Sequence, residues 1–298
     1  MTILPKDELL NRLQSLDKMP TLPVVLAPLL RYLEQPIESL EMQEVVDLIS
    51  KDKSLVAQCL QLANSPLFGR WQTVDSIRSA VLALGMQRMR DIAVSCSVIN
   101  LTPKGKTQMD PVVFWEHSLG CALLSRRFAT KIGFADPGKA YLAALLHDIG
   151  IIANLWVVPQ EFARAFELAR TQHIPLHEAE LMELGLTHGE SGRIVAEKWR
   201  LSPDLAAVAG HHHSPQDAPD NRALVALVSL ADLLCRMSVL GHGFTEQRQV
   251  NLAEEPAFQV LLQECPKLQD FDWALLTFEL ESYLDEVHRL VTALYRPQ

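Results

Sequence analysis

The chain has 298 residues, of which 48% are hydrophobic and 21% charged, a composition typical of a globular protein with room for one large domain or two smaller ones. Its formal charge of −9 argues against a broad surface for nucleic-acid phosphates. The N-terminus carries acidic residues where a signal peptide carries basic ones, and the apolar runs are shorter than a membrane span. We therefore expect a cytoplasmic protein that binds neither nucleic acid nor membrane.

Helical periodicity dominates the sequence and strand-like alternation is nearly absent, so we predict an all-α fold. Ser39 is placed to cap a helix, and Asn64-Ser65-Pro66 ends another, because the residue before a proline avoids the helical region. Gly85 separates two further helices. The helices predicted in the first third cover 6–16, 24–33, 40–51, 54–63, 74–86 and 87–100.

A segment rich in Pro, Gly and polar residues, 101–110, is the best candidate for a linker. We therefore expect an N-terminal helical subdomain over 1–105, a second helical domain over 106–240 and a C-terminal helical extension over 241–298. The amphipathic end of that extension is typical of a packing helix and would also suit a homodimer. The helices predicted after the linker cover 111–131, 139–156, 159–172, 176–184, 188–199, 203–211, 222–239, 254–264 and 271–294.

The cysteines are odd in number, scattered and free of the Cys-x-x-Cys spacing. Most lie in apolar helical segments, so we interpret them as reduced structural thiols of a cytosolic protein. They are Cys59, Cys96, Cys121, Cys235 and Cys265.

His147 and Asp148 lie inside an otherwise apolar run, 141–156. An ionisable pair in such a segment is costly to bury unless something compensates its charge. Imidazole and carboxylate are also ligands that several transition metals prefer. The pair therefore predicts one part of a metal site, provided that the rest of the chain supplies further ligands.

Other helices supply such candidates. His117 lies on an apolar helix face, His188 at a predicted helix start, and His211-His212-His213 at a helix end. Asp232 lies in a helix that is apolar all round and has no Lys, Arg or His over 223–235, so we expect its partner to be a cation or a histidine of another helix. Imidazoles and carboxylates that converge from separate helices are how helical bundles build metal sites.

Each candidate also has a plainer interpretation. A single histidine on an apolar face is more often a hydrogen-bonded core residue, and a histidine triplet at a helix end is often a solvated cap. The ordered set as a whole favours a metal site over these separate interpretations. The remaining histidines lie in polar segments and are expected to be ordinary surface residues: His173, His177, His242 and His288.

His117, the His147-Asp148 pair and Asp232 resemble the ligand set of the HD superfamily of metal-dependent phosphohydrolases. His188 and His212-His213, which Pro215 follows, resemble the wider set of the HD-GYP cyclic-dinucleotide phosphodiesterases, which hold two or more irons. The first third adds Met-Pro-Thr-Leu-Pro at 19–23, Ala-Asn-Ser-Pro at 63–66 and Ala-Val-Leu-Ala-Leu-Gly at 80–85. Together these motifs resemble the HDOD family, the HD-related output domain of bacterial signalling proteins, over about residues 15–235.

The resemblance implies an HD-superfamily-like helical bundle that holds a divalent metal. Iron is the expected metal, with manganese and zinc as alternatives, and the set has room for two ions. Two departures weigh against hydrolysis: Ile151 stands where HD-GYP enzymes carry a Lys, and no Gly-Tyr-Pro follows His213. The implied metal ligands are His117, His147, Asp148, His188, His212, His213 and Asp232.

Three interpretations of function stay open. The leading one is a cytosolic bacterial regulator that holds metal and acts through signalling protein partners or a bound nucleotide or cyclic dinucleotide. The second is a metal-dependent phosphohydrolase that acts on a nucleotide or cyclic dinucleotide, although no catalytic residue is assigned. The third is a metal-free relic in which the same histidines and aspartates form a buried hydrogen-bonded network.

Overall fold

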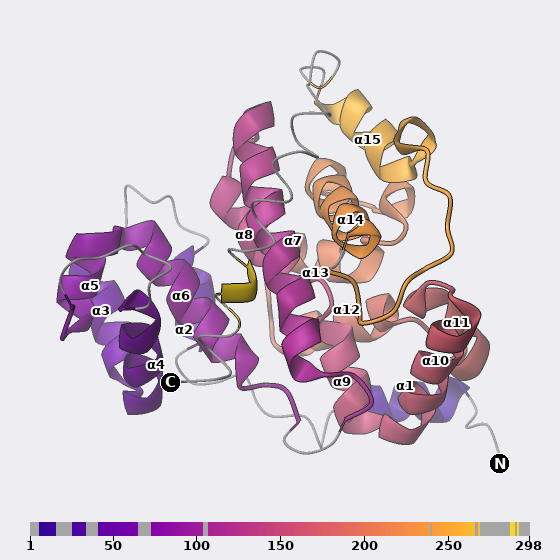
Figure 1. Cartoon of the computed structure of the whole chain (residues 1–298), viewed down its shortest axis with the longest axis horizontal. Coiled ribbons are helices and arrows are strands. Elements are labelled where there is room, and N and C mark those ends of the chain that lie inside the picture. Colours follow the sequence, from indigo (N-terminus) through magenta and orange to yellow (C-terminus); the bar gives the residue numbers. More distant parts are fainter. Residues whose placement is uncertain are drawn as a thin grey trace. The chain divides into compact units, whose positions relative to one another are not determined.

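The computed structural model describes residues 6–15, 26–33, 41–64, 73–103, 107–238 and 240–265, together with 268, 287–289 and 291. These residues form fifteen α-helices and no strand, so the predicted all-α class is confirmed (Figure 1). The chain divides into two compact units. The smaller comprises Pro20–Thr102 with Leu284–Gln298, and the larger comprises Met1–Met19 with Pro103–Tyr283.

In the smaller unit, α6 packs against α2, α4 and α5, and α3 packs against α4 and α5. The Asp52 carboxylate caps α4, and Asn64 ends this helix as predicted. The Asn64 side chain donates to the Val74 carbonyl at 2.8 Å and accepts from the Val74 backbone N–H at 2.7 Å, which joins the end of α4 to the residues just before α5. The predicted cap Ser39 lies outside the described residues. The helices are α2 (Leu26–Leu33), α3 (Met42–Ser50), α4 (Lys53–Ala63), α5 (Ile77–Leu84) and α6 (Met86–Ile99).

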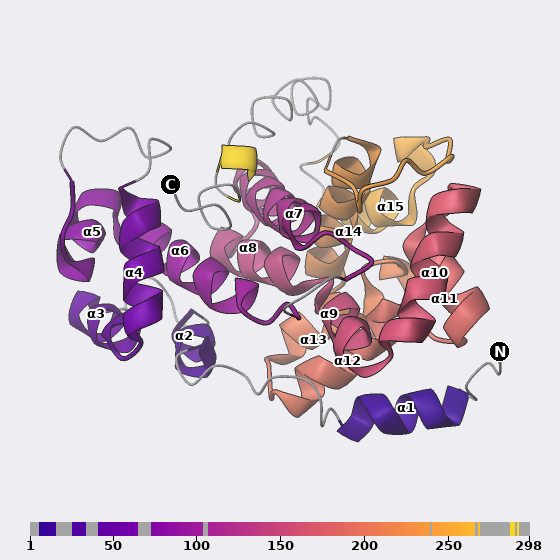
Figure 2. The same cartoon turned by 60° about the horizontal axis from the view of Figure 1, so that its bottom comes forward.

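In the larger unit, α7 packs against α8 and α14, while α12 packs against α9 and α13 (Figure 2). The pairs α10–α11 and α14–α15 lie beside this group. Its helices are α1 (Lys6–Ser15), α7 (Pro111–Ile132), α8 (Pro137–Leu146), α9 (Ile149–Val157), α10 (Pro159–Gln172), α11 (Leu176–Leu184), α12 (His188–Lys198), α13 (Pro203–His211), α14 (Arg222–Met237) and α15 (Pro256–Glu264).

The two units differ from the predicted subdomains at both ends of the chain. Helix α1 packs against α9 and α12 of the larger unit, although it precedes the smaller unit in the sequence. Lys198 of α12 donates to the backbone carbonyl of Gln14 at 2.8 Å. Helix α15 packs against α14, so 241–265 belongs to the larger unit rather than to a separate extension. The predicted helix over 271–294 lies largely outside the described residues.

The single helix predicted over 139–156 is wrong, because the chain breaks at His147 and Asp148 between α8 and α9. The backbone of Asp148 leaves the helical region at φ −94° and ψ 17°. Periodicity could not reveal this break, since residues on both sides of it are apolar and buried. The stretch Pro137–Val157 has the length and hydropathy of a membrane span, but 94% of its most apolar window is buried within the protein, as expected for core helices.

Candidate metal centre

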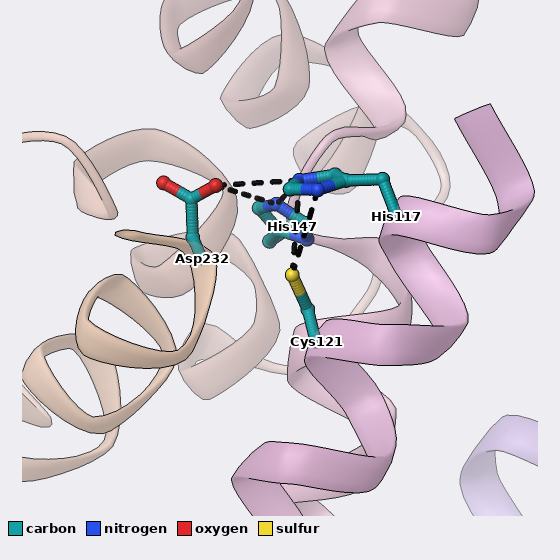
Figure 3. Close-up of side chains that lie close together, drawn as sticks. All are labelled: His117, Cys121, His147 and Asp232. Carbon is teal, nitrogen blue, oxygen red and sulfur yellow. Dashed lines mark hydrogen bonds and ion pairs between the residues drawn. The ribbon is translucent and has the colours of Figure 1, made fainter. Parts of the chain in front are cut away.

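Six helices of the larger unit bring the predicted ligand residues together. His147 ends α8 and Asp148 begins α9, so the break between these helices turns both side chains toward one centre. His117 and Asp232 reach it from the middle of α7 and α14, and Figure 3 shows their side chains pointing toward His147. His188 begins α12 and His212 ends α13, with His213 following. All seven predicted residues therefore lie at one place, with His213 half-buried and the others buried.

Four of the histidines are fixed in the same orientation by their Nδ1 atoms. His117 Nδ1 lies 2.7 Å from the Leu240 carbonyl, and His147 Nδ1 lies 2.6 Å from the Ala144 carbonyl. Likewise, His212 Nδ1 lies 3.1 Å from the Val208 carbonyl. His188 Nδ1 lies 2.6 Å from a carboxylate oxygen of Glu180. These acceptors require a proton on Nδ1, so each neutral ring presents the lone pair of Nε2 to the centre, as metal-bound histidines do.

Asp148 lies where these Nε2 atoms converge. Its Oδ2 is 3.4 Å from Nε2 of His117 and 3.3 Å from Nε2 of His147. Its Oδ1 is 3.2 Å from Nε2 of His188 and 3.4 Å from Nε2 of His212. This Oδ1 atom is buried and makes no hydrogen bond among the described residues. A buried carboxylate oxygen without a hydrogen bond is costly, which points to a cation as its natural partner.

The spacing of several of these atoms is that of ligands around one metal ion. Two ligands bound to one ion at about 2.0–2.1 Å with tetrahedral angles lie about 3.4 Å apart. Charge-assisted hydrogen bonds between nitrogen and carboxylate oxygen are shorter, about 2.7–2.9 Å. The Asp148 distances of 3.2–3.4 Å match the first value, and so does the 3.3 Å between Nε2 of His117 and Nε2 of His147.

The ligand atoms form two adjacent groups, each within 4.8 Å, that could hold one ion apiece. The first group contains His117, Cys121, His147 and Asp232, and the second contains Asp148, His188, His212 and His213. A third overlapping group joins His117 and Asp148 to His242. The residues present therefore fit a divalent metal, and the second ion stays a prediction.

Burial lowers the pKa values of the histidines of the centre, whereas neighbouring carboxylates raise them. Burial lowers the pKa of His117, but hydrogen bonds to Asp148 and Asp232 outweigh it and hold this pKa well above its usual value. Burial likewise lowers the pKa of His188, but Glu180 and Asp148 raise it to about 10. Burial keeps the pKa of His212 low. In the metal-free protein, protons bound by His117 and His188 therefore balance the negative charge of the carboxylates.

Both aspartates stay ionised in this buried position. Burial raises the pKa of Asp148, yet His147 and His117 outweigh burial and hold this pKa well below its usual value. In the same way, burial raises the pKa of Asp232, and Arg236 and His117 bring it well below its usual value. Two ionised carboxylates and several imidazole lone pairs make a strongly cation-attracting centre.

The sequence analysis did not identify Glu180, whose carboxylate holds the Nδ1 side of the His188 ring. Glu180 of α11 is fully buried and accepts both from the His188 ring and, at 2.7 Å, from the His188 backbone N–H. Its other oxygen accepts from Asn154 at 3.1 Å, and Ser191 donates to Asn154 at 2.8 Å. A carboxylate that holds the far side of a ligand histidine orients the ring and raises its basicity. Glu180 lies in a polar segment of the sequence, so only its contacts identify it.

Asp232 has a partner in its own helix in addition to the expected histidine of another helix. Helix α14 continues past Cys235, and Arg236 lies one turn after Asp232 with its Nε 3.0 Å from both carboxylate oxygens. The same guanidinium donates to Glu246 at 2.6 Å. His117 of α7 supplies a second contact, 3.3 Å from Oδ1 of Asp232. Arg236 was overlooked because the apolar run in which Asp232 lies stops one residue before it.

The sequence analysis wrongly assigned two histidines to the protein surface. His242 is buried, and its Nε2 lies 3.0 Å from Oδ2 of Asp148. His177 is half-buried and stacks on His213 with 3.9 Å between the ring centres. His173 and His288 are exposed, as predicted. His242 lies between two glycines in a polar segment, which gives no periodic signal of burial.

The metal-free protein should lose stability as pH rises. The pKa of His188 is raised in the folded state, so its contribution is fully present below about 6.5 and is lost as pH rises through about 10. We expect urea unfolding of chelator-treated protein to show a fall on the order of a few kcal/mol over this window. Metal-loaded protein should show a flatter profile, because a bound imidazole takes up no proton. Equal profiles for the two forms would contradict the metal assignment.

The chain is similar to known proteins over most of its length. The HDOD domain model matches residues 19–215. An uncharacterized protein of Treponema pallidum (strain Nichols) is 25% identical over 226 residues, which cover 74% of this chain and 43% of that protein. The chain thus spans less than half the length of this relative.

Solved structures share the whole architecture. An HDOD domain protein of unknown function from Geobacter sulfurreducens has a TM-score of 0.83 and 29% identity, covering 98% of this chain and 97% of that one. A Shewanella amazonensis protein that carries the provisional name of phosphohydrolase has a TM-score of 0.71 at 23% identity, with 95% and 97% covered. The second likeness shows the fold alone. With a family match over most of its length, the chain belongs to the HDOD family.

Proposed function

We propose that this HDOD protein is a signalling module whose HD-like half holds a divalent metal and acts through a bound ligand or a protein partner. The observation that carries the proposal is the convergence of four Nε2 lone pairs on the Asp148 carboxylate. The buried Oδ1 of Asp148, which has no hydrogen bond among the described residues, supports it further. A bound cation would take up the Nε2 lone pairs and neutralise the Asp148 carboxylate.

We propose iron as the metal, with manganese and zinc as alternatives, because imidazole and carboxylate ligands suit all three. Such an ion would supply positive charge to polarise a bound anion or water. His117, His147 and Asp232 would hold one ion, and Asp148, His188, His212 and His213 would hold a second.

A regulatory role is favoured because, among the described residues, the centre offers no uncommitted cation to a substrate phosphate. Ile151, at the position where the resembling hydrolases carry Lys, is fully buried in the core. Arg236 is already paired with Asp232 and Glu246. Hydrolysis of a phosphodiester needs positive groups that stabilise charge on the phosphate oxygens, and neither Ile151 nor the paired Arg236 is available for this.

A cavity of about 210 Å³ next to the centre supports the binding of a ligand. His212 and His213 form part of its wall, together with Arg236 and Arg248. This volume is below the range of about 300–1,000 Å³ usual for drug-sized ligands. The cavity therefore suits a small anion or the phosphate end of a nucleotide, and it is smaller than a whole cyclic dinucleotide.

The remaining parts of the proposal concern where and with what the module acts. We propose a cytoplasmic protein, because the described cysteines are all free thiols. A signalling protein partner would read the state of the metal centre. We propose no contact with nucleic acid or membrane, and we propose that the segment after α15 supports a homodimer.

Metal content tests the proposal directly. Protein purified without chelator should contain close to one or two equivalents of iron, manganese or zinc by elemental mass spectrometry. Asp148→Asn keeps the shape of the side chain but removes its charge, so we expect metal content to fall by at least about tenfold. Asp217→Asn, at an exposed carboxylate, is the matched control and should keep full content. Wild-type protein without metal would favour the metal-free network instead, and full occupancy in Asp148→Asn would contradict the assignment of the ligands.

A metal-dependent phosphohydrolase is the second candidate. The cavity favours it, because His212 and His213 line a space that suits a small phosphate group beside two candidate ion positions. The test is turnover of nucleotides, small phosphate esters and cyclic dinucleotides by protein loaded with iron or manganese. Turnover that Asp148→Asn abolishes would establish the hydrolase. A fully metallated protein without turnover would favour the regulatory module.

A further inference from the structure

His242 is a buried histidine of the centre that lies outside the ligand set and beyond the residues that the family model matches. It belongs to the irregular segment that follows α14. On one side of it, the Leu240 carbonyl accepts from Nδ1 of His117 at 2.7 Å. On the other side, the backbone N–H of Gln247 donates to the His173 carbonyl at 2.7 Å. The segment is therefore fixed on both sides of His242.

The His242 ring is in contact with the carboxylate at the middle of the centre. Its Nε2 atom lies 3.0 Å from Oδ2 of Asp148, which is a hydrogen-bonding distance between two buried groups. This distance is shorter than the 3.2–3.4 Å that separate the Asp148 oxygens from the four ligand histidines around them. The Nδ1 atom of His242 is also buried and makes no hydrogen bond among the described residues.

The position of the ring proton separates His242 from those four histidines. Burial lowers the pKa of His242 to about 4, so the ring carries one proton at neutral pH. On Nδ1 that proton would be a buried donor without an acceptor, and the Nε2 lone pair would face a carboxylate oxygen. On Nε2 the proton is donated to Asp148 instead. His242 therefore presents a proton to the centre, where the ligand histidines present lone pairs.

We propose that His242 is a positioning residue that holds the Asp148 carboxylate in the orientation in which it binds metal. The inference rests on the metal centre proposed above and adds no ligand to it. Oδ2 of Asp148, which accepts from His242, lies 3.4 Å from Nε2 of His117, and Oδ1 lies 3.2 Å from Nε2 of His188. The carboxylate thus turns one oxygen to each group of ligand atoms. The hydrogen bond from His242 fixes this rotation, as partners of ligating carboxylates do.

His242→Leu removes the donor and keeps an apolar side chain in a buried position. We expect its affinity for zinc, measured by competition with a chromophoric chelator, to fall about 10–100-fold. His242→Gln is the rescue variant, because its amide NH₂ reaches about as far as Nε2 and can donate to the same oxygen. Its affinity should return to near the wild-type value, whereas an amide would not rescue the loss of an imidazole ligand.

His173→Gly is the matched control for movement of the segment. His173 Nδ1 lies 2.9 Å from the Thr245 carbonyl, and its left-handed φ of 56° suits glycine. This variant loosens the segment without touching the centre, so its zinc affinity should stay unchanged. A loss in His173→Gly as large as that in His242→Leu would overturn the specific role of the His242 donor.

The ring proton itself can be observed without any comparison of affinities. In zinc-loaded protein whose histidines carry the heavy nitrogen isotope, long-range nuclear magnetic resonance spectra distinguish the two tautomers of a neutral ring. We expect His242, assigned by the signal that its variants lack, to be protonated at Nε2. Protonation at Nδ1, or equal zinc affinity in wild type and His242→Leu, would overturn the inference and leave the metal centre standing. No zinc bound by wild-type protein would overturn both.

Discussion

Gly150→Ala should lower the free energy of unfolding by more than about 3 kcal/mol, because a methyl group at this position has no space. A Cβ atom on Gly150 would lie 1.9 Å from the backbone oxygen of His188 and 2.6 Å from the backbone nitrogen of Gly192. Both atoms are backbone, so the strain could be relieved only by moving α12 away from α9. That movement would carry His188 away from Asp148, and metal content should fall together with stability.

Gly192→Ala is the matched control for this variant. Gly192 lies on the facing helix α12, but the nearest atoms to a Cβ there are 3.4 Å away, an ordinary contact. Replacing a helical glycine at such a site should change stability by about 1 kcal/mol or less. Urea unfolding followed by circular dichroism measures both variants. A Gly150→Ala protein within 1 kcal/mol of the wild type would contradict the close approach of α9 and α12.

Arg236→Met should destabilise the metal-free protein by about 3–5 kcal/mol, because it leaves two carboxylates without their cation. Arg236 is nearly fully buried and pairs with Asp232 and Glu246. Methionine keeps much of the apolar stem, so the change isolates the charge. Arg248→Met is the control, since Arg248 is 40% exposed and pairs with Glu255, and it should cost about 1 kcal/mol at most.

The effect of Arg236→Met should depend on pH in a defined direction. Arg236 and His117 hold the pKa of Asp232 well below its usual value of 3.8, so the carboxylate stabilises the fold above that pH. This contribution is lost as pH falls through the depressed pKa of the folded state. The unfolding free energies of wild type and variant should therefore converge in acid. A difference that persists unchanged at low pH would show that Arg236 acts through packing rather than charge.

The sequence predicted those parts of the molecule that depend on local periodicity and on motif. The helices over 159–172, 176–184 and 203–211 agree with α10, α11 and α13 to the residue. The seven candidate ligands meet at one place, and the apolar or helix-end setting of each was the signal that identified them in the sequence. Their role as ligands stays a prediction until metal content is measured.

What the sequence could not predict depends on contacts between distant segments. Glu180, Arg236 and His242 all face the centre, yet Glu180 and His242 lie in polar stretches with the pattern of surface residues. The break at His147 is equally hidden, because it falls inside continuous apolar sequence. Helical periodicity reports which face of a helix is buried, and it carries no information on where a buried helix bends or which polar residue the partner helix supplies.

The hydrogen bond between His117 and the Leu240 carbonyl has a consequence for how this protein can be divided. The family match ends at residue 215, but Asp232, Arg236, Leu240 and His242 all contribute to the centre from beyond that point. A fragment cut at the family boundary would contain His117 and His147 without the carboxylate and carbonyl that face them. The unit that folds as a functional whole is therefore longer than the unit that the family motif defines. A transplant of this module into another protein would have to carry the chain at least through His242.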